Sequence, residues 1–169
     1  VLFTACDREF SDVVQFATFS RNGEIFVEAP GGLGSDFFFP FLNAIADAFS
    51  VDNDEGFESN STNRIDVPNA DEPAGGFAGA IFRIDGAGRN LTGFDALTFY
   101  AKASRGVSIG EFGFGQDFLE NRYQVTTFGL PLTTNWVKYV IPIPDPSKLI
   151  EERGMFWFSA GSQTTGGAG

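Results

Sequence analysis

The chain of 169 residues lacks histidine altogether and has one cysteine and one methionine. Without histidine, the usual general base near neutral pH is missing, and so are the Ser-His-Asp and Cys-His arrangements and most zinc or copper sites. A lone cysteine cannot form a disulfide within the chain. Carboxylate chemistry and oxygen-ligand metals such as calcium remain compatible with this composition.

Basic residues are also few, and long apolar runs are missing. Lys and Arg total 11 against 22 Asp and Glu, which gives a formal net charge of −11. Such a surface repels phosphate backbones, so we expect no nucleic acid among the partners. No run approaches the roughly 18 apolar residues of a membrane-spanning helix. The length fits one domain with a sizeable core.

Phenylalanine and glycine are abundant, at 21 residues each. Aromatic residues favour strands, glycine favours tight turns, and stretches with helical periodicity are nearly missing. The sequence therefore predicts an all-β antiparallel β-sandwich over residues 13–160. We expect its short strands in the ranges 13–19, 24–28, 34–41, 64–67, 77–84, 96–103, 107–114, 123–127, 136–143 and 155–159. In the range 96–103, Leu97, Phe99 and Ala101 share one face, and Thr98, Tyr100 and Lys102 the other.

The first residues resemble the end of a bacterial lipoprotein signal. Residues 1–5 (VLFTA) are apolar and then small, and Cys6 follows, although Phe3 stands where such signals usually carry Leu. On this interpretation residues 1–5 are the end of a signal peptide. Cys6 is then a lipidation site, and residues 6–12 are a tether. The alternative is an unmodified cysteine in a terminal strand.

Two segments suggest binding sites. Residues 51–63 form an acidic loop in which Asp52, Asp54 and Glu58 are candidate ligands for a structural calcium ion; a solvated turn is the alternative. Residues 110–125 (GEFGFGQDFLENRYQV) combine aromatic, amide, carboxylate and guanidinium groups, which suits sugar recognition; core packing plus a polar loop is the alternative. The predicted stacking residues are Tyr100, Tyr123 and Trp157, and the predicted hydrogen-bonding residues are Glu111, Gln116, Asp117 and Arg122. Trp136 is interpreted as a core or sheet-edge residue.

Residues 94–158 resemble a known family. The segments are FDALTFYAKAS, IGEFGFG, LTTNWVKYVIPIPDPSKL and ERGMFWFSAG. They place Asp95, Leu97, Phe99, Ala101 and Lys102 in a D-x-L-x-F-x-A-K pattern, followed by Thr133, Trp136 and Tyr139 in T-x-x-W-x-x-Y. The pattern is similar to that of jelly-roll carbohydrate-binding domains of Bacteroidota surface lipoproteins, which often stand beside β-glucanase-type glycoside hydrolases.

The resemblance implies a jelly roll that binds carbohydrate without catalysing a reaction. Such domains usually continue into a further strand after the Gly-rich segment, here residues 161–169, so we expect a jelly roll that lacks its last strand. The expected function is binding of a neutral, β-glucan-like polysaccharide. The expected location is the outer membrane of a bacterium, at the cell surface through a Cys6 anchor, with a possible catalytic domain beyond Gly169.

Two other functions remain open. One is a structural or adhesive surface module that binds no glycan. The other is a jelly-roll glycoside hydrolase or lyase, which would need a carboxylate pair or a Tyr/Lys or Tyr/Arg pair in a cleft. Exposed aromatic residues would favour glycan binding over the structural module.

Overall fold

A computed structural model describes residues 19–29, 32–69, 76–84, 86–115 and 123–162. It confirms the predicted all-β antiparallel sandwich, and eleven strands lie in the described residues. These are β1 (Phe26–Ala29), β2 (Gly32–Ser35), β3 (Phe37–Pro40), β4 (Phe49–Asp52), β5 (Thr62–Ile65), β6 (Phe77–Arg83), β7 (Ala96–Ala101), β8 (Val107–Phe114), β9 (Val125–Leu132), β10 (Val137–Pro142) and β11 (Gly154–Gly161).

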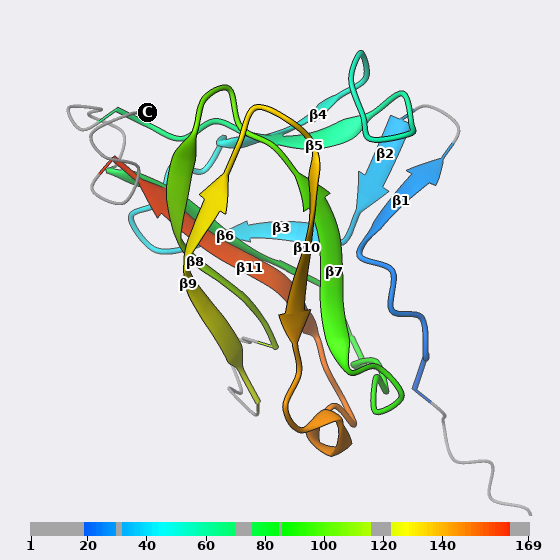
Figure 1. The fold of residues 1–169 in the computed structure, drawn as a ribbon. Coiled ribbons are helices and arrows are strands. Elements are labelled where there is room, and N and C mark those ends of the chain that lie inside the picture. Colours follow the sequence, from blue (N-terminus) through cyan, green and yellow to red (C-terminus); the bar gives the residue numbers. More distant parts are fainter. Residues whose placement is uncertain (1–18, 30–31, 70–75, 85, 116–122, 163–169) are drawn as a thin grey trace, which may run out of the picture.

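One layer is a five-stranded antiparallel sheet in the order β3-β6-β11-β8-β9. The other elements are two-stranded ribbons: β7 with β10, β4 with β5, and β1 with β2. Figure 1 shows the β7–β10 ribbon in front of the five-stranded sheet, with the β4–β5 ribbon above and the β1–β2 ribbon to one side. The second layer is thus divided into separate ribbons.

Aromatic side chains fill the space between the layers. Phe82 on β6 is 1% exposed, and its ring lies 5.0 to 5.4 Å from those of Phe26, Phe38 and Phe49. Phe99 on β7 lies 5.4 Å from Phe156 on β11. Such ring contacts favour edge-to-face and offset arrangements and hold the layers together. The large number of phenylalanines is explained in part by this core.

An ion pair attaches the segment before β1 and the start of β3 to the sandwich. Arg89 Nη2 donates to Asp36 Oδ1 at 2.7 Å, Arg89 Nη1 donates to the carbonyl of Glu24 at 2.8 Å, and both side chains of the pair are about 10% exposed. Burial raises the pKa of the Asp36 carboxyl, and the nearby Arg89 guanidinium only partly offsets this. The pair links residues 53 positions apart in the chain.

The sequence missed some elements. The Gly-rich strand β2 was not expected, and β4 begins at Phe49 and runs into the predicted acidic loop. The described residues contain one helical element, a single 3-10 turn at Pro146–Lys148. No helix in the described residues has the length and apolar character to cross a bilayer. The predicted strand at 13–19 lies outside the described residues except for Phe19.

Candidate functional site

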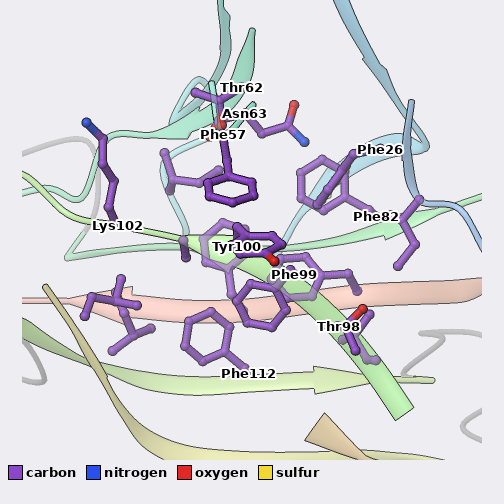
Figure 2. Close-up of a pocket in the computed structure, with 18 of the residues that line it drawn as sticks. Phe26, Phe57, Thr62, Asn63, Phe82, Thr98, Phe99, Tyr100, Lys102 and Phe112 are labelled. Carbon is purple, nitrogen blue, oxygen red and sulfur yellow. Dashed lines mark hydrogen bonds between the residues drawn. The ribbon is translucent and has the colours of Figure 1, made fainter. Parts of the chain in front are cut away.

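A cavity of about 1080 Å³ lies between the five-stranded sheet and the separate ribbons. β7, β5 and residues 21–26 line its sides, and side chains from β6, β8 and β11 line its floor. Figure 2 shows Phe57 above Tyr100, with Phe82 to one side and Phe99 and Phe112 below. The cavity exists because β7 pairs only with β10, and β5 only with β4, among the described strands.

Three aromatic side chains gather at the mouth of this cavity, and we call them the aromatic cluster: Phe57, Tyr100 and Trp136. The Phe57 and Tyr100 rings are stacked, with centroids 3.7 Å apart and planes at 10°. Trp136 approaches Phe57 edge-on at 6.3 Å. Tyr100 is 42% exposed, and the cluster therefore presents aromatic surface to solvent.

Strand register explains how the cluster forms. Tyr100 and Lys102 alternate with the inward-facing Phe99 and Ala101 on β7. β10 pairs with β7 so that Val137 lies opposite Ala101 and Lys138 opposite Tyr100, which brings Trp136, one residue before β10, beside Lys102. The loop between β4 and β5 then supplies Phe57.

Charged groups border the cluster. The Lys102 ammonium lies 5.4 Å from the centre of the Trp136 ring, within the range of a cation–π contact. The same ammonium pairs with the carboxylate of Glu55 from the β4–β5 loop. This pair fixes the loop over β7 and leaves a donor and an acceptor next to an aromatic surface.

The structure separates the predicted stacking residues. Tyr100 is exposed in the cluster, as expected. The expectation for Trp157 is wrong: its side chain is 2% exposed, because it packs on β11 against Gly113, where a Cβ would lie 2.2 Å from the indole. Tyr123 is half-buried against the core, its hydroxyl accepts a hydrogen bond from Asp145 N at 2.9 Å, and Lys148 Nζ lies 5.2 Å from its ring.

The predicted hydrogen-bonding residues do not join the cluster. Glu111 lies on β8, half-buried and paired with Phe128 and Ser159, in the five-stranded sheet rather than beside Tyr100. Gln116, Asp117 and Arg122 lie outside the described residues. In the described residues, Glu111 is therefore separate from the aromatic cluster, which is built on β7 and the β4–β5 loop.

The predicted calcium ligands lie at the end of β4 and in the loop before β5. Asp52 Oδ1 accepts a hydrogen bond from Asp54 N at 2.9 Å, which closes a local turn, and Asp54 and Glu58 are exposed. The described residues contain no group of three or more acidic, histidine or cysteine side chains placed to hold a metal ion. Calcium binding by Asp52, Asp54 and Glu58 therefore stays a prediction.

Sequence reasoning missed two members of the cluster. Phe57 is the single aromatic residue of the acidic loop at residues 51–63. An apolar ring in an otherwise polar loop is the one sequence signal that could have indicated a role for it. Trp136 was interpreted as core or sheet edge, although it is half-buried at the rim of the cavity. The lipidation site predicted at Cys6 lies outside the described residues.

Compared with known proteins, the chain matches no family model, no curated protein and no solved structure.

Proposed function

We propose that the protein is a non-catalytic binding module that holds a neutral β-linked polysaccharide at the aromatic cluster. The observation that carries this proposal is the 42% exposed ring of Tyr100 on β7. Phe57 from the β4–β5 loop stacks on this ring, and Trp136 approaches Phe57 edge-on. The apolar face of a pyranose stacks on such rings, while nearby polar groups bond its hydroxyls. Lys102 and Glu55 lie where they can serve as these polar groups.

Charge supports a neutral ligand. The chain carries a net charge of −11, which disfavours anionic glycans, and the ammonium over the Trp136 ring, that of Lys102, is paired with Glu55. Stacking and hydroxyl contacts carry no net charge, so binding should depend little on salt. The same net charge supports a solvated surface rather than a phosphate-binding one.

The resemblance of residues 94–158 to surface lipoprotein domains extends the proposal to the cellular location and to the strand topology of the sandwich. On this proposal the sandwich is a jelly roll, and Cys6 anchors it to the outer membrane, exposed at the cell surface. Mass analysis of the protein isolated from bacterial membranes would detect the lipid on Cys6, and an unmodified N-terminus there would argue against the anchor.

Replacing Tyr100 with alanine should weaken polysaccharide binding at least about fivefold, because an aromatic contact at the centre of a binding site is worth more than about 1 kcal/mol. The measurement is retardation in native gels containing laminarin, xyloglucan or mixed-linkage glucan. The matched control is Phe128→Ala, which removes a 70% exposed ring from β9 in the other layer.

We expect the wild-type protein and Phe128→Ala to be retarded equally, and Tyr100→Ala to migrate freely. If no polysaccharide retards the wild-type protein, the proposed function is wrong, and a structural surface module becomes the better account. If Tyr100→Ala and the wild-type protein are retarded equally, glycan binding lies elsewhere on the chain.

A further inference from the structure

One face of the Tyr100 ring, on which the proposed function depends, is covered by Phe57. The two ring centroids are 3.7 Å apart and the ring planes are nearly parallel, at 10°. Figure 2 shows Phe57 above Tyr100. A pyranose that stacks on an aromatic ring needs the same place, because carbon atoms in contact lie about 3.5–4.0 Å apart. Phe57 and a sugar ring therefore compete for this face of Tyr100.

The geometry of this stack makes Phe57 a replaceable partner. Aromatic pairs favour offset or edge-to-face arrangements with centroids about 4.5–7 Å apart, because rings that overlap face to face bring like partial charges together. The Phe57 and Tyr100 rings are closer than this range and overlap face to face. The C–H groups of a pyranose carry partial positive charge, so they meet the negative ring face without this repulsion. A sugar ring thus suits this face of Tyr100 better than Phe57 does.

Phe57 belongs to the β4–β5 loop, residues 53–61, which is stabilised by contacts among its own residues. Ser59 Oγ donates a hydrogen bond to the Ser61 carbonyl at 3.0 Å. A Cβ at Gly56 would lie 2.5 Å from the same carbonyl oxygen, so the glycine lets the loop fold back on itself. Such internal contacts persist when the loop turns as a unit about the ends of β4 and β5.

Polar contacts at the surface hold this loop against its neighbours. The Glu55 carboxylate pairs with the Lys102 ammonium, and the two side chains are 51% and 27% exposed. Asn60 N donates to Glu28 Oε1 at 3.4 Å, which is long for a hydrogen bond. Ion pairs that water reaches contribute little to stability, so a movement that breaks them is accessible to the folded protein.

The remaining rings of the cluster stay in place when the loop moves, because the β7–β10 ribbon carries them. β10 pairs with β7 over Val137–Pro142, Trp136 directly precedes β10, and Lys138 lies opposite Tyr100. Residues opposite each other in an antiparallel pair point to the same side, so the exposed Lys138 accompanies Tyr100 on the outer face of the ribbon. With Phe57 displaced, this face offers an uncovered ring with ammonium donors for sugar hydroxyls beside it.

We propose that Phe57 and the β4–β5 loop form a gate over Tyr100, closed by the Glu55–Lys102 ion pair, and that a sugar ring enters by taking the place of Phe57. This inference rests on the proposed function and adds the step that controls access to the same site. A site that is open only part of the time binds with an affinity reduced by the open fraction. Variants that loosen the gate therefore bind polysaccharide more tightly than the wild-type protein.

Replacing Phe57 with alanine tests the gate, because the two possible roles of this ring give opposite results. Removal of a gate should tighten binding about two- to tenfold, the range for an aromatic pair that must separate on opening. Removal of a ring that itself holds the sugar would weaken binding. Affinity electrophoresis at graded concentrations of laminarin, xyloglucan and mixed-linkage glucan measures the dissociation constant. The matched control is Phe128→Ala, which removes an exposed ring from β9 and should bind as the wild-type protein does.

Replacing Glu55 with glutamine tests the ion pair separately, because the amide loses the charge but still bonds to sugar hydroxyls. We expect binding about two- to fivefold tighter, the range for an exposed ion pair. The control is Asp47→Asn, which removes one negative charge from an exposed position in the turn before β4.

A second measurement follows the gate without any sugar. In Trp157→Phe, Trp136 is the single tryptophan, and it contacts both the Phe57 ring and the Lys102 ammonium. Adding Phe57→Ala or Glu55→Gln to this variant should increase the quenching of Trp136 emission by acrylamide, because the gate no longer covers the indole. Far-UV circular dichroism establishes that each variant is folded.

The possible failures are distinguishable. Equal or weaker polysaccharide binding by Phe57→Ala than by the wild-type protein would overturn the gate and leave the proposed function intact. Free migration of the wild-type protein and of both gate variants would overturn the proposed function, and the gate with it. Unchanged quenching of Trp136 in Glu55→Gln would overturn the ion pair as the contact that closes the gate.

Discussion

Replacing Phe82 with alanine is expected to lower the free energy of unfolding by about 3–5 kcal/mol. Phe82 is 1% exposed and lies on β6 of the five-stranded sheet. This strand pairs with β3 on one side and with β11 on the other. Its ring contacts Phe26 and Phe38, which come from two other strands. Removal of the ring thus loosens the contacts between three strands and leaves a void that the surrounding rings cannot fill.

Urea denaturation followed by circular dichroism measures this loss. Phe128→Ala is the control because it removes the same ring from a 70% exposed position, where substitution should change stability by no more than about 0.5 kcal/mol. Equal losses for the two variants would contradict the described packing of the core.

Replacing Arg89 with methionine is expected to cost about 3–5 kcal/mol at neutral pH, because it leaves the buried Asp36 carboxylate and the Glu24 carbonyl without the guanidinium. The double variant Arg89→Met/Asp36→Leu should recover most of the loss, since it removes the stranded charge as well. The control is the exposed pair of Arg64 with Asp66, whose side chains are 59% and 63% exposed. Arg64→Met should cost about 0–1 kcal/mol.

The loss in Arg89→Met should depend on pH in a definite direction. Burial already raises the pKa of Asp36 above 3.8 in the folded protein, and removal of Arg89 raises it further. The folded state then binds a proton more tightly than the unfolded state, so stability falls as pH rises from about 4 through the folded pKa. The difference from the wild-type protein should therefore be small at pH 3.5 and largest at neutral pH. A difference that grows toward low pH would contradict the assignment of this ion pair.

Alternation of residue types predicted the strands well where both faces of the strand have distinct neighbours. β8 spans Val107–Phe114, the predicted range, and β7 and β10 agree to within two residues at each end. β2 was missed because its sequence, GLGS, carries too few side chains to show a pattern. Alternation of apolar and polar residues along a strand follows from local chain geometry, so it can be read from the sequence where the side chains are large enough to show it.

The candidate site was predictable only in part. Tyr100 follows from the alternation of β7, but alternation does not tell which face of a strand another element covers. Trp157 lies on β11, in which no position is exposed, and it is buried over Gly113. Phe57 reaches Tyr100 from a loop 43 positions earlier in the chain, and such a contact depends on tertiary structure that no local pattern specifies.

The most direct test of the proposed glycan site uses the two tryptophans. Trp136 is in the aromatic cluster and Trp157 is buried in the five-stranded sheet, so Trp157→Phe leaves Trp136 as a single fluorophore that reports on the site. Titration of this variant with a soluble β-glucan oligosaccharide should produce a saturable change in Trp136 emission, and the change should disappear in Trp157→Phe/Tyr100→Ala. Unchanged Trp136 emission at oligosaccharide concentrations that compete with gel retardation would contradict glycan binding at the cluster.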